Sequence, residues 1–382
     1  MVLFGKRYLM APGPTAVPED VLLEAARPIM HHRTPDFSGI LWAVSNDLKK
    51  IFKTEQPVYI LASSGTGAME FALVNTCSVG DKVLIVVGGK FGERWFEMAR
   101  AYGLDTVVYE IEWGSAPLPE EIDRYLKEHP DIKAVFTTLF ETSTGTVYDI
   151  EAIARCVQES NAILVVDAVS GMAACDLQMD NWGVDVVVAS SQKAFMLPPG
   201  LSFVAFSEKA SKLVGKSDLP SYYFSALDYK KAYFSNTTPY TPAVSLIVQL
   251  RKALSVMLEE GIDNVIRRHA LLAEATRMGV KAIGLELFSS NPGNVCTAVK
   301  IPTGIDGVKL LSRIRDVYKV TISGGQGKLK GKILRIAHLG YAYAFDVVIA
   351  ISALEMALKD EGYPVELGRG VGAAELILRE GK

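Results

Sequence analysis

Short apolar runs alternate with amphipathic stretches through the first two-thirds of the chain. Several runs are continuously apolar, which is typical of strands buried on both faces of a sheet. The strands predicted in this way are 57–63, 82–89, 105–113, 133–140, 162–168, 185–190 and 201–207. Helical spacing of apolar residues predicts helices between them at 67–76, 91–102, 118–129 and 149–160. This alternation predicts an α/β fold with a mostly parallel sheet.

The strand at 201–207 interrupts the alternation. It follows the strand at 185–190 with no room for a helix between them. A parallel connection needs a longer crossover, usually a helix. We therefore predict that this last strand runs antiparallel.

The final third of the chain has a different pattern. A long helical pattern begins near Pro242, and a domain boundary is expected inside it. It is followed by predicted strands at 294–302 and 332–338, a helix at 306–318 and a closing helix at 344–362. At roughly 100–200 residues per domain the length suggests two domains. We predict a Pro- and Gly-rich arm at 1–15, a large domain at 16–255 and a small α+β domain at 256–382.

Charge and cysteine content exclude several classes of function. Lysine and arginine total 40 against 43 acidic residues, so the net charge of −3 gives no argument for nucleic acid or an anionic membrane. We find no secretory signal and no apolar run long enough to cross a bilayer. The cysteines Cys77, Cys156, Cys175 and Cys296 form no CxxC pair, which argues against a metal site. We expect reduced thiols in a cytoplasmic protein.

The stretch "ASSGTGAME" (62–70) is the first candidate for chemistry. A predicted strand ends there, Ser64-Gly65-Thr66-Gly67 makes a tight turn, and an apolar-faced helix begins. Free N–H groups at a helix N-terminus, small residues and two hydroxyls can bind a phosphate. The alternative is a plain strand-to-helix turn with a capping serine. The fingerprints of dinucleotide and nucleoside-triphosphate sites are absent.

Two ionisable side chains follow later strands. Asp167 ends the strand in "AILVVDAVSG", and Lys193 follows the strand in "VVVASSQKAF". Ligands of open α/β sheets bind beyond the carboxyl ends of the strands. An acid there can pair with a protonated ring nitrogen, and a lysine withdrawn from water near other cations becomes an amine nucleophile. Taken alone, Asp167 can be a helix cap and Lys193 a lysine extended along the sheet edge.

The order of these features along the chain indicates which cofactor the sheet binds. A phosphate-binding turn, an acid for a ring nitrogen and a Schiff-base lysine succeed one another on one α/β sheet. Pyridoxal 5′-phosphate (PLP) requires this set of groups from a protein. We therefore predict that PLP is the cofactor and that the domain at 16–255 binds it.

With these residues the chain resembles the class V aminotransferases, PLP enzymes of fold type I, and among them the alanine–glyoxylate and serine–glyoxylate (serine–pyruvate) enzymes. The resemblance implies an aspartate-aminotransferase-like large domain with a smaller C-terminal domain. It covers nearly the whole chain. Seven segments carry it in the family's order: "LMAPGPTAVP", "ASSGTGAME", "FETSTGTV", "VVDAVSG", "SSQKAF", "TTPYTPAVS" and "KLKGKILRIAHLG".

The resemblance implies a role for each matching residue. Lys193 would hold the cofactor covalently and later move a proton, acting as a general base and acid. Asp167 would pair with the ring nitrogen, and Arg335 would bind the substrate carboxylate in a bidentate pair. The remaining cofactor contacts would come from Ser64, Gly65, Thr66 and Gln192 on the phosphate, Thr142 on the ring hydroxyl, Val169 under the ring, and Thr238 and Thr241 reaching the phosphate from a second subunit. The last two imply a homodimer with active sites at the subunit interface.

Three segments need separate comment. Phe91, in "GKFGERW", stands where many relatives have a tryptophan or another aromatic that stacks on the cofactor. Phenylalanine stacks with less area, so we expect stacking to survive. Without the resemblance, Arg335 would be taken as a surface ion pair. The Gly- and Lys-rich stretch 323–332 is either a solvated hairpin or a mobile loop bordering the active site.

The implied reaction moves an amino group from alanine or serine to glyoxylate or pyruvate in a ping-pong cycle. Aspartate or 2-aminoethylphosphonate stays open as the donor, because class V enzymes differ there. A cysteine desulfurase usually has a histidine before the lysine, where Gln192 stands here, and Cys296 lies in an apolar strand. A non-catalytic role, for example as a soluble hydrogenase subunit, is disfavoured by the presence of Lys193 and Asp167 and by the lack of iron–sulfur or nickel ligand spacing.

Overall fold

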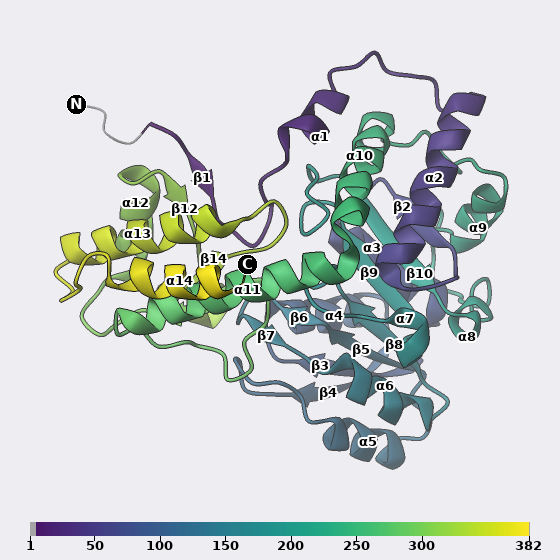
Figure 1. Ribbon diagram of the computed structural model, residues 1–382. Coiled ribbons are helices and arrows are strands. Elements are labelled where there is room, and N and C mark those ends of the chain that lie inside the picture. The colour runs from purple at the N-terminus through teal and green to yellow at the C-terminus, as the bar shows by residue number, and fades with distance from the viewer. Residues whose placement is uncertain (1–4, 382) are drawn as a thin grey trace.

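A seven-stranded sheet is the centre of the molecule (Figure 1). The computed structural model describes residues 5–381, so residues 1–4 of the predicted arm and residue 382 of the predicted small domain lie outside it. Within this range the strand order of the sheet is β2-β10-β9-β8-β5-β3-β4. The strands are Val58–Leu61 (β2), Lys82–Val87 (β3), Asp105–Glu110 (β4), Ala134–Thr138 (β5), Ile163–Asp167 (β8), Val186–Ser190 (β9) and Ser202–Phe206 (β10).

The direction of the strands confirms the predicted topology. β10 is antiparallel to both β2 and β9, while the other neighbouring pairs are parallel. The prediction for 133–140 is too long, because β5 ends at Thr138. Phe140–Glu141 (β6) instead pairs with Thr146–Val147 (β7) in a separate hairpin. That hairpin directs the chain across the carboxyl edge of the sheet.

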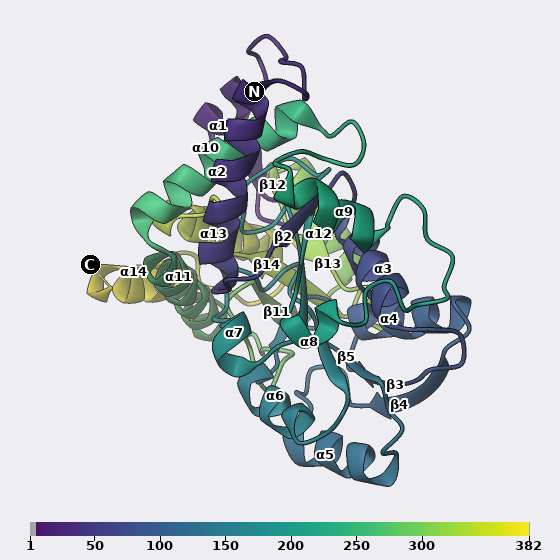
Figure 2. The same cartoon turned by 90° about the vertical axis from the view of Figure 1, so that its right-hand side faces the viewer.

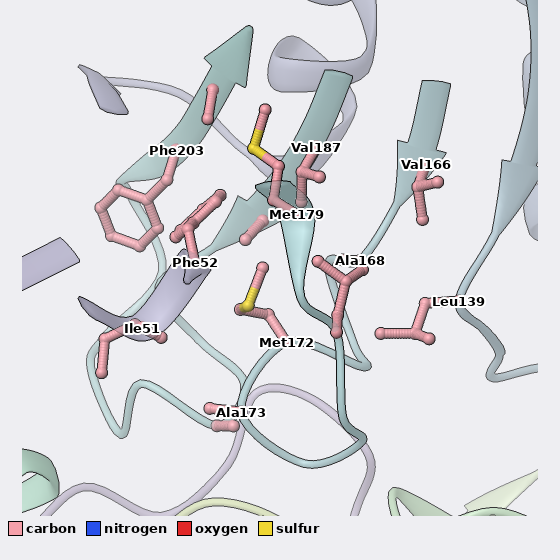
Figure 3. Packing of buried hydrophobic residues seen from close by; sticks show 14 of the residues in the cluster. Ile51, Phe52, Leu139, Val166, Ala168, Met172, Ala173, Met179, Val187 and Phe203 are labelled. Carbon is pink, nitrogen blue, oxygen red and sulfur yellow. The ribbon is translucent and has the colours of Figure 1, made fainter. Parts of the chain in front are cut away.

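Helices cover both faces of the sheet (Figure 2). The helices whose buried residues join the first face are Glu19–Glu24 (α1), Pro35–Phe52 (α2), Pro119–Glu128 (α5), Ile150–Gln158 (α6), Met179–Trp182 (α7) and Val244–Glu260 (α10). Those of the second face are Gly65–Thr76 (α3), Lys90–Ala101 (α4), Glu208–Ser211 (α8) and Ala226–Phe234 (α9). The strand pleat explains the division, because Val187 joins the first cluster and Val186 and Val188 the second. In Figure 3, Phe52, Met179 and Val187 converge in the first cluster.

The sequence analysis does not predict α2, although its residues contain the signals of a helix. The Thr34 hydroxyl accepts a hydrogen bond from the Phe37 N–H at 3.4 Å, and Pro35 occupies the first turn, where it is tolerated. The buried residues Phe37, Ile40, Leu41, Val44, Leu48, Ile51 and Phe52 recur at helical spacing.

A second group of elements forms the C-terminal part. Cys296–Lys300 (β11), Ile333–Ala337 (β14) and Ser323–Gly324 (β13) make an antiparallel sheet. Ile262–Ala282 (α11), Gly307–Asp316 (α12), Ala344–Asp360 (α13) and Arg369–Glu380 (α14) supply its apolar cluster. The helical pattern that begins near Pro242 divides at Gly261, whose φ is 85°. Because α10 and α11 join different clusters, a boundary inside this pattern is consistent with the packing; the boundary at 255/256 stays a prediction.

The predicted closing helix at 344–362 is not the last one, since α14 follows it. α14 packs on α11, where a Cβ on Gly370 would lie 2.8 Å from the Gly279 carbonyl oxygen. Glycines permit this close approach of the two backbones. Gly370 and Gly372 lie within α14 and hide its apolar periodicity in the sequence.

The N-terminal segment connects the two groups of elements. Tyr8–Leu9 (β1) pairs in parallel with Val320–Thr321 (β12), and the Ala337 N–H donates to the Met10 carbonyl at 2.9 Å. Five residues later, the Thr15 N–H donates to the Gln192 carbonyl at 3.1 Å. Among residues 5–381, no helix is both long and apolar enough to cross a membrane.

Truncation of the first buried cluster tests its contribution to stability. Phe52 is fully buried, so Phe52→Ala is expected to lower the free energy of unfolding by about 3–5 kcal/mol. Phe345, at 80% exposure, is the matched control, and Phe345→Ala should cost within about 0.5 kcal/mol. Urea titration followed by circular dichroism measures both; equal losses would contradict the assignment of Phe52 to the core.

Candidate active site

Lys193 lies in the turn that follows β9, at the carboxyl edge of the sheet. Its Nζ donates a hydrogen bond to the Pro12 carbonyl. Burial lowers the pKa of Lys193 to about 8; Cys296 and Asp167 oppose this shift, and the positive charges of Arg335 and Arg94 add to it. Withdrawal from water therefore does more than neighbouring cations to favour the neutral amine.

The N-terminal segment fixes the position of this lysine. Gly13 has φ 142°, and a Cβ there would lie 2.2 Å from the Lys193 Nζ. The Thr15 hydroxyl donates to the Lys193 carbonyl at 3.0 Å. The positive φ and the close approach of the lysine side chain both favour glycine at position 13, a preference that the sequence analysis did not identify.

Asp167 ends β8, paired with Thr138 on one side and Val188 on the other. One carboxylate oxygen accepts a hydrogen bond from the Val169 N–H at 2.8 Å. Burial raises the pKa of Asp167 to about 6, and the hydrogen bond from Val169 opposes that shift. At pH 7 the carboxyl group stays mostly ionised, as a partner for a cationic ring nitrogen must be.

The turn at 64–66 has the capping serine that the sequence suggested, and phosphate binding there stays a prediction. The Ser64 hydroxyl caps α3 by accepting from the Gly67 N–H at 3.4 Å. A Cβ on Gly65 would lie 2.7 Å from a Val169 methyl group and 3.3 Å from the Ser190 hydroxyl. The small residue therefore lets the turn, Val169 and the end of β9 meet closely.

Arg335 lies in β14 between β11 and β13, and it is only 5% exposed. Its Nη1 donates to the Thr142 carbonyl at 2.7 Å, and its Nε and Nη2 donate to the Gly324 carbonyl at 3.0 and 2.8 Å. No carboxylate of residues 5–381 forms a salt bridge with it, so it is not a surface ion pair. Burial lowers the pKa of Arg335 from its ordinary high value.

The stretch 323–332 borders this arginine. Ser323–Gly324 pairs with β14, and Gly327–Leu329 forms a short 3-10 turn (η1). Because the Gly324 carbonyl binds the guanidinium, the hairpin is part of the wall of the site.

The cysteine nearest to this site is Cys296. Its thiol is buried, and its Sγ lies 3.9 Å from the Thr142 carbonyl oxygen. Burial raises the pKa of the thiol to about 11. A thiol with a raised pKa is a poor nucleophile.

Thr238 and Thr241 are not brought to Lys193 by this chain. The Thr238 hydroxyl donates to the Tyr240 carbonyl at 2.7 Å, and its own carbonyl accepts from Arg33 Nη1 at 2.9 Å. Thr241 is exposed. Within the described part of the chain, neither makes a hydrogen bond to Lys193, Asp167 or the turn at 64–66.

Two residues near Phe91 were missed by the sequence analysis. The buried carboxylate of Glu141 accepts from the N–H groups of Phe91 at 3.0 Å and Gly92 at 3.2 Å, which caps α4. Burial raises the pKa of Glu141. Arg94 contacts both Phe91 and Thr66. A cation in the early turns of a helix opposes the helix dipole and could have drawn attention to Arg94.

The comparison with protein families decides the class. The family model for the class V aminotransferases matches residues 7–327. The chain belongs to the class V aminotransferases. This family is PLP-dependent, which agrees with the fold and with the resemblance found in the sequence.

Individual relatives carry different names. The chain is 41% identical over 379 residues to the "soluble hydrogenase, small subunit" of Synechococcus sp., with 98% of each chain covered. It is 38% identical to serine–glyoxylate aminotransferase of Methylorubrum extorquens, with 98% and 97% covered. The crystal structure of pyridoxamine–pyruvate aminotransferase from Mesorhizobium loti superposes with a TM-score of 0.95 at 29% identity, covering 99% and 98% of the two chains.

The residues at this edge fit PLP. Within residues 5–381, eight buried side-chain polar atoms have no hydrogen-bond partner, and three of them belong to Thr142, Ser190 and Gln192. Buried polar groups without partners are unfavourable, and a polar ligand can satisfy them. Ser190 ends β9 and Gln192 directly precedes Lys193 in the turn after it, so two of these groups come from the segment that carries the lysine.

The lowered pKa of Lys193 can be measured in the cofactor-free protein. At pH 8 about half of the Lys193 amine should be neutral, against well under about 1% for an ordinary lysine of pKa about 10.4. Acetic anhydride labelling across a pH series, read by peptide mass spectrometry, should give a midpoint for Lys193 well below that of the other lysines. A shared midpoint would contradict this electrostatic description.

Proposed function

We propose that this chain is a PLP-dependent transaminase that moves an amino group from a small amino acid, alanine or serine, to glyoxylate or pyruvate in a ping-pong cycle. The observation that carries the proposal is a set of three groups in a chain of this family. A withdrawn lysine amine and a buried carboxylate lie at the carboxyl edge of the central sheet, and a buried arginine without a salt-bridge partner among residues 5–381 comes from β14 of the C-terminal sheet. Their mutual charge effects are already visible in the pKa of Lys193, which responds to both Asp167 and Arg335.

The chain supplies one group for each requirement of the reaction. Bound PLP would supply an electron sink that allows a proton to leave the donor Cα. Lys193 Nζ, neutral after losing its own proton, accepts that proton and returns it. Asp167 keeps a positive charge on the ring nitrogen, and Arg335 orients the substrate by its carboxylate. Both substrates carry that carboxylate, so one arginine serves both halves of the cycle.

The remaining sequence-predicted residues would hold the cofactor. Ser64, Gly65, Thr66 and Gln192 are assigned to the phosphate and Thr142 to the ring hydroxyl. Val169 and Phe91 are assigned to the two faces of the ring. The unpartnered side-chain oxygens of Thr142 and Gln192 support these assignments.

Serine is favoured as the donor by the relative named serine–glyoxylate aminotransferase. The name of the superposed enzyme, pyridoxamine–pyruvate aminotransferase, indicates a different amino donor on a very similar backbone. Aspartate and 2-aminoethylphosphonate therefore remain alternatives. A desulfurase is disfavoured because the thiol of Cys296 is buried and has a raised pKa. The hydrogenase name describes that relative, and the presence of Lys193 and Asp167 favours an enzyme here.

A homodimer would complete the site, with Thr238 and Thr241 reaching the phosphate in the other subunit. Large apolar side chains are exposed at Leu23, Ile29 and Trp42, beside or within α1 and α2. Exposed apolar surface is available for association between subunits. We also keep the expectation of a cytoplasmic enzyme.

Absorbance spectroscopy tests the reaction and the donor together. Alanine, serine, aspartate and 2-aminoethylphosphonate are added one at a time to the yellow, PLP-loaded protein. We expect alanine or serine to bleach the cofactor band and glyoxylate or pyruvate to restore it. Lys193→Ala should lose the covalent cofactor band and turnover while its circular dichroism stays unchanged. Turnover by Lys193→Ala at the wild-type rate would reject the assignment of this lysine.

Removing the carboxylate-binding arginine should affect both substrates. Arg335→Ala is expected to raise KM for the amino acid and the 2-oxo acid and to lower kcat/KM by an amount equivalent to about 2–5 kcal/mol. Arg313, whose guanidinium pairs with Asp360 and Glu361 on the surface, provides the control Arg313→Ala. Steady-state kinetics decide the question: unchanged values for Arg335→Ala would place the carboxylate elsewhere.

A further inference from the structure

Arg94 joins two parts of the site that are far apart in sequence. It lies in the second turn of α4, three residues after Phe91. Its Nη1 donates a hydrogen bond to the Thr66 hydroxyl at 3.2 Å, in the first turn of α3. Its guanidinium carbon lies 4.9 Å from the centre of the Phe91 ring. One planar cation therefore touches the residue expected to stack on the cofactor ring and a residue expected to bind its phosphate.

The charge of Arg94 is not used in an ion pair. The neighbouring carboxylate of Glu93 pairs with Lys90 instead, and within residues 5–381 Arg94 has no salt bridge. Because no salt bridge of the described residues neutralises the Arg94 guanidinium, its positive charge shifts the pKa values of the other ionisable groups in the site. Its charge favours the ionised carboxylate of Asp167 and the neutral amine of Lys193.

Phe91 is thus held from two directions. The Glu141 carboxylate accepts a hydrogen bond from the Phe91 backbone N–H at 3.0 Å, which holds the Phe91 backbone in the first turn of α4. Arg94 covers its ring, and cation–π contacts of this kind restrict where a ring can lie. Because phenylalanine offers less stacking area than tryptophan, a fixed ring orientation matters more here than in relatives with the larger side chain.

We propose that Arg94 is a positioning residue that orients both the Phe91 ring and the Thr66 hydroxyl. The pyridine ring and the phosphate of one cofactor molecule can then contact these two side chains at the same time. Arg94 acts through these two side chains. This inference rests on the proposed PLP site, and it adds to that site a residue that links α3 to α4.

The test measures the affinity of the cofactor-free full-length protein for PLP by absorbance titration. Arg94→Gln is expected to weaken the affinity by about tenfold, the scale of one lost charge-assisted contact. Arg94→Lys keeps the charge and should recover part of the loss. The matched control is Arg100→Gln on the same helix, where an exposed guanidinium lies 5.6 Å from the Phe96 ring; it should leave the affinity within about twofold.

Double-mutant cycles separate positioning from a general structural effect. If Arg94 acts through its two neighbours, Arg94→Gln should have a clearly smaller effect when combined with Phe91→Leu or with Thr66→Val than in the wild-type protein. The thermal midpoint of each cofactor-free variant is recorded alongside, and a loss of affinity without a matching loss of stability supports the proposal.

The possible failures are distinguishable. If wild-type protein binds PLP and Arg94→Gln binds it equally well, the inference about Arg94 is wrong while the proposed function stands. Full additivity in both cycles would also overturn it, because Arg94 would then act independently of Phe91 and Thr66. If the wild-type protein does not bind PLP, the proposed function fails and the role of Arg94 fails with it.

Discussion

The structure depends on keeping a lysine amine out of water at the end of a buried strand. Desolvation costs a charged ammonium more than a neutral amine, so the fold itself favours the reactive form of Lys193. The withdrawal is produced by close backbone contact, since Gly13 lies against the side chain and the Pro12 carbonyl accepts its hydrogen bond. The nearby charges change the pKa of Lys193 less than burial does.

The sheet brings residues that are distant in the sequence close together around this amine. The carboxyl ends of β8 and β9 adjoin, so Asp167 and the turn carrying Lys193 share one edge. The antiparallel sheet of the C-terminal part contributes Arg335, whose guanidinium is held by two backbone carbonyls rather than by a counter-ion. That choice of partners leaves it without a salt bridge among residues 5–381, although the charge of the buried Glu141 also acts on it. The class V assignment and this electrostatic arrangement thus agree without depending on each other.

Local patterns in the sequence predicted the central sheet and several of its helices, although α2 was missed despite the helical spacing of its apolar residues. Continuous apolar runs located the strands of the central sheet, and the short connection before β10 revealed its direction. Strand ends indicated Asp167 and Lys193 because open sheets bind ligands there. Gly13, Arg94 and Glu141 were missed because their importance arises from contacts between distant segments, which no periodicity records. α14 was missed for a related reason, since Gly370 serves the packing against Gly279 and dilutes the apolar pattern.

The path of the N-terminal segment has a consequence for how the protein can be altered. Ends of chains usually tolerate trimming, because few contacts hold them. Here the stretch from Tyr8 to Thr15 pairs with β12, contacts β14 and then passes through the centre of the molecule to Gln192 and Lys193. Shortening the chain past Tyr8 would therefore remove backbone that holds Lys193 in place rather than a loose end, and any circular permutation would have to leave this stretch uncut.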